Sequence, residues 1–540
     1  MSRLLLAAAV ATLVLAAGAF EIKEATLASI QLGFKNGSLT SVDLVRLYLD
    51  RISRLNPLLR AVIEVNPDAL HHAARADAER RSASSIKYLA GGGLLHGVPV
   101  LLKDNIATHD ALNTTAGSLT LLGSVARRDA GVVRRLRLAG AVVLGKANLD
   151  EWANFRSLHG SDGWSARGGQ ARNPYVLSAD PCGSSGGPAI AAAANMVAVT
   201  LGTERDGSIL CPASLNSVVG IKPTVGLTSE PESSPSHHGK TRSGPWLQLA
   251  VSHGGVPIHT TPGISPSTSL HMIWHLALHT CCSKTPTHDS PDELHAVQKQ
   301  KNTCRYEIKI KPNRRNEFLN MDGLKGKRIG VPNGFFNFPN GTVQHMVYRQ
   351  HLNTMRKQGA ILIENLDIDK LDITMDNLNN GQQIALPAEF KLSLNSYLLD
   401  LSYSPVRSLA EIIAFNNAHP VEEKLKEIGQ IIFLAAENTT GIGAPERAAI
   451  RQLKKLSTNG LEKLMKEHKL DAIVTPNADA SLVLAIGGMP GISVPAGYGK
   501  MGVPFGLCFR GLRGFEPRLI EMAYAFEQHT KVRKAPMFMP

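Results

Sequence analysis

The chain has 540 residues, of which 43% are apolar and 19% charged, a composition typical of a globular protein with a large core. The formal net charge is +13, but most basic residues are scattered and the chain holds only 9 Tyr and 4 Trp. Because no stretch interleaves basic with aromatic residues for base stacking, we expect no nucleic-acid partner.

The N-terminus predicts a cleavable secretory signal peptide over residues 1–19. Arg3 supplies positive charge, an apolar run extends from Leu4 to Leu15, and small residues suited to cleavage follow. The alternative is a membrane anchor, but the run is shorter than the roughly 20 residues that a span prefers. We therefore expect a secreted protein without stable membrane insertion. Sequons of the Asn-x-Ser/Thr type fit secretion but add little, because a long chain carries several by chance: Asn36, Asn113, Asn340 and Asn438.

Up to residue 229, helical patterns alternate with short apolar runs. In Thr40–Asn56 the apolar residues recur at near-helical spacing, and Thr40 and Asp43 are placed to cap this helix reciprocally. The run Val98–Lys103 predicts a strand that ends at a lysine. The other expected helices are Glu21–Gly33, Ala130–Ala139 and Pro188–Asn195, and the other expected strands are Ala141–Gly145 and Met196–Leu201.

Residues 230–316 break this pattern, because they are rich in Ser, His, Pro and Lys. Taken alone, they predict a linker or a disordered insert. The alternation then resumes with strands at Arg328–Val331, Ala360–Leu366, Asp471–Pro476, Gly491–Pro495 and Gly506–Phe509 and a helix at Val343–Gly359. Helices alternating with short apolar strands predict an α/β fold built on a mixed sheet.

Two serines in glycine-rich turns, Ser184 and Ser208, and the lysine Lys103 are the candidate catalytic groups. A serine hydroxyl has too high a pKa to attack an amide without an adjacent base. Burial lowers the pKa of a lysine, which leaves a neutral amine able to act as that base. A relay from Ser208 through Ser184 to Lys103 is therefore chemically coherent. The plainer interpretation is that Gly/Ser clusters are turns and that a lysine after a strand lies on the surface.

The residues around these serines are the candidate oxyanion- and substrate-binding groups. Backbone N–H groups of a turn that follows a strand converge on an anion, and residues 205–208 form such a turn. The candidates are Ser185, Arg205, Asp206 and Gly207.

These motifs in this order resemble the amidase signature family. The family's lysine segment Gly-Val-Pro-x-x-x-Lys-Asp is matched by Gly97–Asp104, its bridging-serine segment by Gly183–Gly187, and its nucleophile segment by Gly207–Pro212. The resemblance extends over about residues 21–229 and 317–540, and includes Gly145–Leu149 and Gly491–Gly497.

The resemblance implies a mixed sheet covered by helices on both faces, in a single domain of residues 20–540. It also implies hydrolysis of a small-molecule carboxamide to a carboxylate and ammonia or an amine, through a serine acyl-enzyme. Ser208 is then the nucleophile, Ser184 the bridging serine held by a cis peptide, and Lys103 the base. No metal or organic cofactor is implied.

Two departures from the family pattern keep other hypotheses open. Arg205 stands where a plant and bacterial subset has Thr, and we expect its bulk to crowd the substrate more than its charge assists the oxyanion. Codons for Glu230–Pro245, read in a neighbouring frame, spell a string that resembles the family, so we interpret 230–316 as a frameshift or intron-derived segment. A catalytically impaired family member with a binding role is therefore the alternative. A second alternative is a subunit of an aminoacyl-tRNA amidotransferase. Such a subunit works with partners in an internal compartment, which a secretory signal contradicts.

The six cysteines follow no zinc-ligand spacing: Cys182, Cys211, Cys281, Cys282, Cys304 and Cys508. Cys182 and Cys211 flank the two serine turns, but spacing alone proves no disulfide. We therefore favour buried thiols that behave as small apolar residues.

Overall fold

The computed structural model of the chain describes residues 24–82, 95–157, 159–227, 249–253, 318–376 and 379–539. The predicted signal peptide lies outside these residues, and so does the segment 230–316 apart from residues 249–253. No helix within the described part of the chain is long and apolar enough to cross a membrane.

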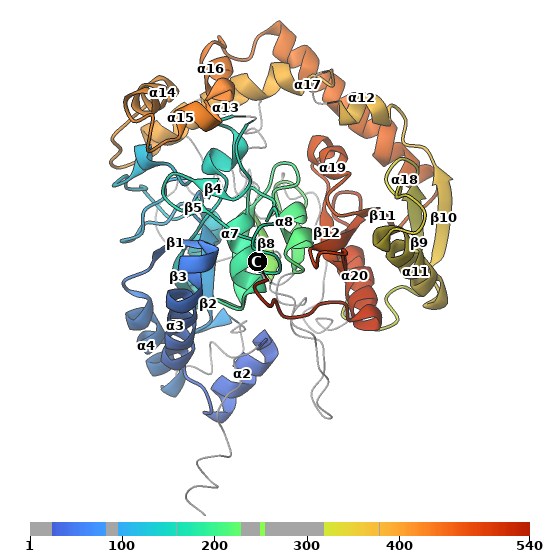
Figure 1. Cartoon of the computed structure of the whole chain (residues 1–540), viewed down its shortest axis with the longest axis horizontal. Helices are drawn as coiled ribbons and strands as arrows, with labels where there is room; N and C mark the ends of the chain where they lie inside the picture. Colours follow the sequence, from blue (N-terminus) through green and yellow to red (C-terminus); the bar gives the residue numbers. More distant parts are fainter. Residues whose placement is uncertain are drawn as a thin grey trace, which may run out of the picture.

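A single mixed sheet of 11 strands forms the centre of the molecule (Figure 1), in the order β1-β3-β2-β6-β8-β7-β12-β13-β11-β9-β10. Strand β2 is parallel to β3 and β6, whereas β8 is antiparallel to both β6 and β7. The strands are β1 (Val62–Val65), β2 (Pro99–Lys103), β3 (Val142–Ala147), β6 (Val199–Thr203), β7 (Val219–Lys222), β8 (Leu249–His253), β9 (Arg328–Pro332), β10 (Ile361–Leu366), β11 (Ala472–Pro476), β12 (Gly491–Tyr498) and β13 (Pro504–Arg510). A separate small sheet pairs β4 (Trp164–Ser165) with β5 (Gly169–Gln170).

The expected mixed sheet is confirmed, and each predicted strand is present with its ends shifted. The strand expected at Met196–Leu201, for example, begins at Val199 and extends to Thr203. Strands β1, β4, β5, β7 and β8 were not predicted. Strand β8 comes from within the segment 230–316, so this segment supplies a strand between β6 and β7.

Helices cover both faces of the sheet. On β11, Ala472 and Val474 belong to the largest core cluster, which also contains residues of α3, α11 and α20, whereas Ile473 belongs to a second cluster with residues of α18 and α19. Because successive side chains of a strand point to opposite faces, the two clusters lie on opposite sides of the sheet. The helices around the sheet are α2 (Leu27–Asn36), α3 (Ser41–Leu59), α4 (Ala69–Arg81), α6 (Gly131–Leu138), α7 (Gly186–Ala193), α8 (Leu210–Leu215), α11 (Val343–Lys357), α18 (Lys463–Glu467), α19 (Ser481–Gly487) and α20 (Glu516–Thr530).

The starts of the first two helices follow from their caps. The Thr40 hydroxyl accepts the Asp43 N–H at 3.0 Å and the Asp43 carboxylate accepts the Thr40 N–H at 3.3 Å, which confirms the predicted capping box of α3. Of the helix predicted at Glu21–Gly33, the start at Glu21 lies outside the described residues, and residues 24–26 are not helical. The helix begins at Leu27, because the Thr26 hydroxyl accepts the N–H of Ser29 at 2.8 Å and so caps it there.

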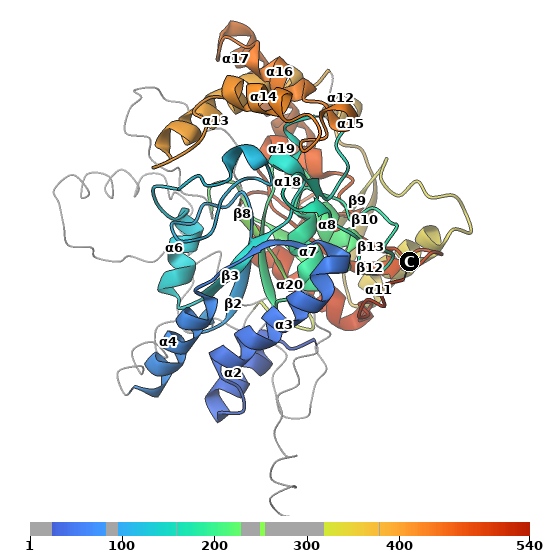
Figure 2. The same cartoon turned by 60° about the vertical axis from the view of Figure 1, so that its left-hand side comes forward.

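Six helices form an arch that spans the molecule above the sheet, at the top of Figures 1 and 2. In the core of the arch the ring of Phe390 stacks on that of Phe433, and Phe433 packs edge to face against Trp152. The buried Arg156 guanidinium lies 2.6 Å from the Glu151 carboxylate and 2.9 Å from that of Glu423. These contacts fasten the arch to the loop after β3. The arch consists of α12 (Leu371–Met375), α13 (Gln382–Asp400), α14 (Leu409–Ala418), α15 (Leu425–Ile428), α16 (Ile431–Glu437) and α17 (Ala444–Ser457).

Candidate active site

The predicted lysine and the first serine meet at one edge of the sheet. Lys103 ends β2 and Thr203 ends the parallel neighbour β6, so both residues lie at the same edge. The buried Lys103 Nζ lies 2.7 Å from Ser184 Oγ, 3.0 Å from Ser185 Oγ and 3.3 Å from the Thr203 carbonyl oxygen. The structure therefore brings Lys103 and Ser184 together. Ser185, expected as an oxyanion or substrate contact, instead lies beside Lys103 and donates its hydroxyl proton to the Thr203 carbonyl.

The hydrogen bonds of this cluster suit Lys103 both as an ammonium and as a neutral amine. Ser185 Oγ donates its single proton to the Thr203 carbonyl at 3.0 Å, so it only accepts from Lys103. The Thr203 carbonyl is also only an acceptor. A neutral amine has two N–H donors and one lone pair, so those two partners take both donors. As an ammonium, Lys103 also donates to Ser184 Oγ, whereas as a neutral amine it presents its lone pair to that hydroxyl.

Burial lowers the pKa of Lys103 to about 7, although the carboxylates of Asp150 and Glu204 act in the opposite direction. An amine with this pKa is largely unprotonated at slightly alkaline pH. The environment of Lys103 is thus suited to a base.

Main-chain contacts hold the two serine turns against each other. The Gly183–Ser184 peptide is cis, which agrees with the resemblance. The N–H of Asp150 donates to the Ser184 carbonyl at 3.2 Å. The N–H of Ser185 donates to the Ser208 carbonyl at 3.0 Å, so the turn that carries Ser208 rests on the one that carries Ser184.

Ser208 is half-buried in the turn between β6 and α8, and its hydroxyl forms no hydrogen bond to a described residue. The preceding Gly207 has a φ of +73°, a conformation that suits glycine. The turn is also tethered by a residue that sequence reasoning missed, the buried Glu204. Its carboxylate accepts the N–H of Gly207 at 3.0 Å, of Ile209 at 2.7 Å and of Leu210 at 3.0 Å. An acidic residue directly before a glycine-containing turn was the available signal.

The tether corrects the expected set of oxyanion donors. The N–H of Gly207 is committed to Glu204, so it is not a free donor in this structure. The N–H groups of Arg205, Asp206 and Ser208 donate to no described residue and remain available. The turn therefore offers three N–H groups rather than four.

The side chains of Arg205 and Asp206 connect the turn to helices α13 and α19. The Arg205 guanidinium, with 16% of the side chain exposed, donates to Gln382 Oε1 at the start of α13 and lies 4.0 Å from the Asp206 carboxylate. Asp206 accepts the hydroxyl proton of Ser481 in α19 at 2.6 Å. Arg205 thus connects the turn to the arch, a contact that the sequence did not predict.

The comparisons with known proteins identify the family. The family model for Amidase matches residues 43–248. A protein of Arabidopsis thaliana named "Probable amidase" is 50% identical over 521 residues, which cover 96% of this chain and 93% of the relative. The chain belongs to the amidase signature family. The solved structure of native peptide amidase from Stenotrophomonas maltophilia is 36% identical to this amidase, with a TM-score of 0.77 over 96% of this chain and 99% of that one.

The predicted family, fold class and enzyme class are thereby confirmed, and the chain is an amidohydrolase. A Glutamyl-tRNA(Gln) amidotransferase protein from Thermoanaerobacter pseudethanolicus is 28% identical over 96% of this chain and 98% of the relative. The amidotransferase is thus a more distant relative of this amidase than the amidases named above.

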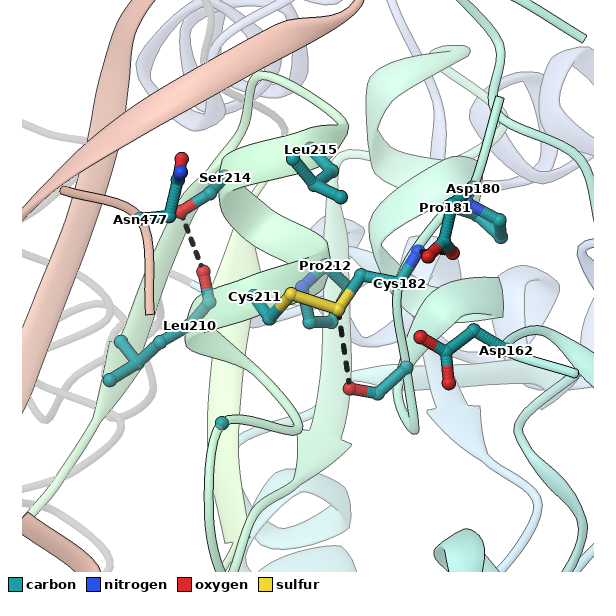
Figure 3. Close-up of a disulfide and its surroundings, with 12 residues drawn as sticks. Asp162, Asp180, Pro181, Cys182, Leu210, Cys211, Pro212, Ser214, Leu215 and Asn477 are labelled. Atoms are coloured by element: carbon teal, nitrogen blue, oxygen red, sulfur yellow. Dashed lines mark hydrogen bonds between the residues drawn. A yellow bond between two sulfur atoms is a disulfide. The ribbon is translucent and has the colours of Figure 1, made fainter. Parts of the chain in front are cut away.

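The interpretation of Cys182 and Cys211 as free thiols was wrong. They form a disulfide across 29 positions, with Cα atoms 6.0 Å apart (Figure 3). The spacing could not show this, because a disulfide depends on the relative placement of two Cβ atoms. The bond joins the chain just before Ser184 to the chain just after Ser208. Cys508 is a free buried thiol, as favoured. Among the described residues, no group of three His, Cys, Asp or Glu side chains could hold a metal ion.

Proposed function

We propose that this amidase hydrolyses primary carboxamides through an acyl-enzyme on Ser208, with Ser184 and Lys103 as the proton relay. The observation that carries the proposal is the contact of the buried Lys103 Nζ with Ser184 Oγ at 2.7 Å, across which a proton can pass. A buried amine with a pKa of about 7 is matched to this task, because a general base works best near the operating pH.

The relay moves one proton in each half of the reaction. Ser184 passes its proton to Lys103 and takes the proton of Ser208, whose oxygen bonds to the carbonyl carbon of the substrate. The relay then runs in reverse, so that the leaving nitrogen gains the proton as the C–N bond breaks. Water attacks the acyl-enzyme by the same route and restores Ser208. The free N–H groups of Arg205, Asp206 and Ser208 stabilise the oxyanion formed in both halves.

For the substrate we propose the terminal carboxamide of an amino acid or short peptide. The support is the similarity to the peptide amidase from Stenotrophomonas maltophilia over nearly the whole chain. Ammonia is the leaving group in this case.

We also propose that the protein passes through the secretory pathway after cleavage near Ala19, as one amidase domain of residues 20–540. The Cys182–Cys211 disulfide supports this, since such bonds persist in oxidising compartments. N-terminal sequencing of the mature protein tests it. A start at Phe20 is expected, and recovery of the intact N-terminus contradicts it.

The function is tested by ammonia release from an N-acylated amino-acid amide, with Lys103→Met as the variant. Loss of the base should lower kcat by roughly 10²–10⁴-fold. The matched control is Lys146→Met. Lys146 is also fully buried, on the neighbouring strand β3, but its Nζ contacts the Ile106 carbonyl and Thr114 Oγ1 at 2.7 Å each. Equal losses in the two folded variants would refute the role of Lys103.

A further inference from the structure

Asp150 lies against the bridging serine from the loop that follows β3. Its N–H donates to the Ser184 carbonyl at 3.2 Å, and its side chain is buried. The carboxyl group lies against the Cα of Gly183, where a Cβ would come within 1.8 Å of Asp150 Oδ2. Asp150 therefore sets the position of the Gly183–Ser184 backbone from two sides.

The Asp150 carboxyl forms several hydrogen bonds, one of them with the Asp162 side chain, but has no cation in direct contact among the described residues. Oδ1 accepts the N–H of Gly163 at 2.5 Å and Oδ2 accepts from Asn154 Nδ2 at 2.7 Å. Within the described residues, Asp150 forms no ion pair. Lys103 is the cation whose field acts on it, and Asp150 is the first of the two carboxyl groups that act on Lys103.

We propose that Asp150 is a positioning residue of the amide hydrolysis, which holds Ser184 by its main chain and stabilises by its carboxylate the ammonium that Lys103 becomes when it takes the proton. The inference rests on the proposed function. No residue other than Lys103 gains charge in the relay, so a carboxylate near it acts on the charged state selectively.

Other carboxyl groups set how readily Asp150 ionises. Burial and the nearby Asp162 raise the pKa of Asp150 to about 8, whereas Lys103 lowers it. Asp162 in turn faces Asp180, which lies with it beside the disulfide (Figure 3). Glu204 faces Lys103 from the other turn. Removing the Asp150 charge should therefore lower the pKa of Lys103, and removing the Asp162 charge should raise it by making Asp150 ionise more readily.

The test compares the pH dependence of kcat/KM for the full-length protein and the variants Asp150→Asn and Asp162→Asn. For Asp150→Asn, the acidic limb should move to lower pH. Its kcat on the plateau should fall about tenfold, with KM little changed, because a transition-state interaction is lost. For Asp162→Asn, the acidic limb should move to higher pH.

The opposite signs separate this role from a merely structural one. Shifts in the same direction, or no shift in folded variants, would overturn the inference while the wild-type activity stands. An inactive wild-type protein would instead overturn the proposed function. If Asp150→Asn fails to fold, the variant of the half-buried Asp162 still tests the inference. Asp162→Asn alone must raise the apparent pKa of the acidic limb of kcat/KM.

Discussion

The disulfide provides a perturbation whose size follows from the structure. Replacing Cys182 and Cys211 by Ala opens a loop of 29 residues that contains Ser184 and Ser208. The chain-entropy relation for a loop of this length gives a loss of about 3.6 kcal/mol in the free energy of unfolding. This is a large part of the roughly 5–15 kcal/mol by which domains are stable.

The same change should lower activity. Without the disulfide, the hydrogen bond from the Ser185 N–H to the Ser208 carbonyl is the direct main-chain link between the two serine turns. Because a displacement of about 1 Å in an active site costs up to about 10²-fold, we expect kcat/KM to fall on the order of tenfold below the unfolding temperature.

Urea unfolding and ammonia release measure the two effects separately. The control is Cys508→Ala, which removes a buried thiol that forms no disulfide. The contrary result is a double variant that keeps its full kcat/KM and a free energy of unfolding within about 1 kcal/mol of the wild type. That result would refute the proposed role of the disulfide in holding the two serine turns together.

Three further outcomes are expected. Arg205→Thr removes the contact with Gln382 and should raise kcat/KM on bulky amides while leaving small ones unchanged; a fall of kcat on every amide would show that the guanidinium assists the reaction. Mass spectrometry after deglycosylation should find Asn113 unmodified, because its Nδ2 donates to Glu64, whereas a glycan there would contradict the described side-chain geometry. Transcript sequencing should restore a family-like frame in 230–316, and limited proteolysis of the present chain should cut there; a confirmed frame and resistance would make the segment a genuine insert.

The parts of the site that the sequence predicted rest on local patterns. The apolar run that ends at Lys103 predicts a buried strand, and two parallel strand ends then place Lys103 beside the serine turn. The glycines around Ser184 and Ser208 predict turns for the same local reason.

The parts that it missed depend on contacts between distant segments. The arch as a unit depends on contacts between distant segments, such as the ion pairs of Arg156 with Glu151 and Glu423. Asp150 reaches Ser184 only because the loop after β3 folds back over the sheet edge. The disulfide likewise required the relative placement of two turns, which no spacing encodes.

Ser208 is the nucleophile of the proposed reaction, and covalent labelling tests this most directly. Purified protein is treated with a fluorophosphonate probe, and the modified peptide is located by mass spectrometry. We expect a single adduct on Ser208, lost in Ser208→Ala and formed far more slowly in Lys103→Met, with the exposed Ser38→Ala labelled like wild type. Labelling that persists in Ser208→Ala, or an adduct on another serine, would contradict the claim.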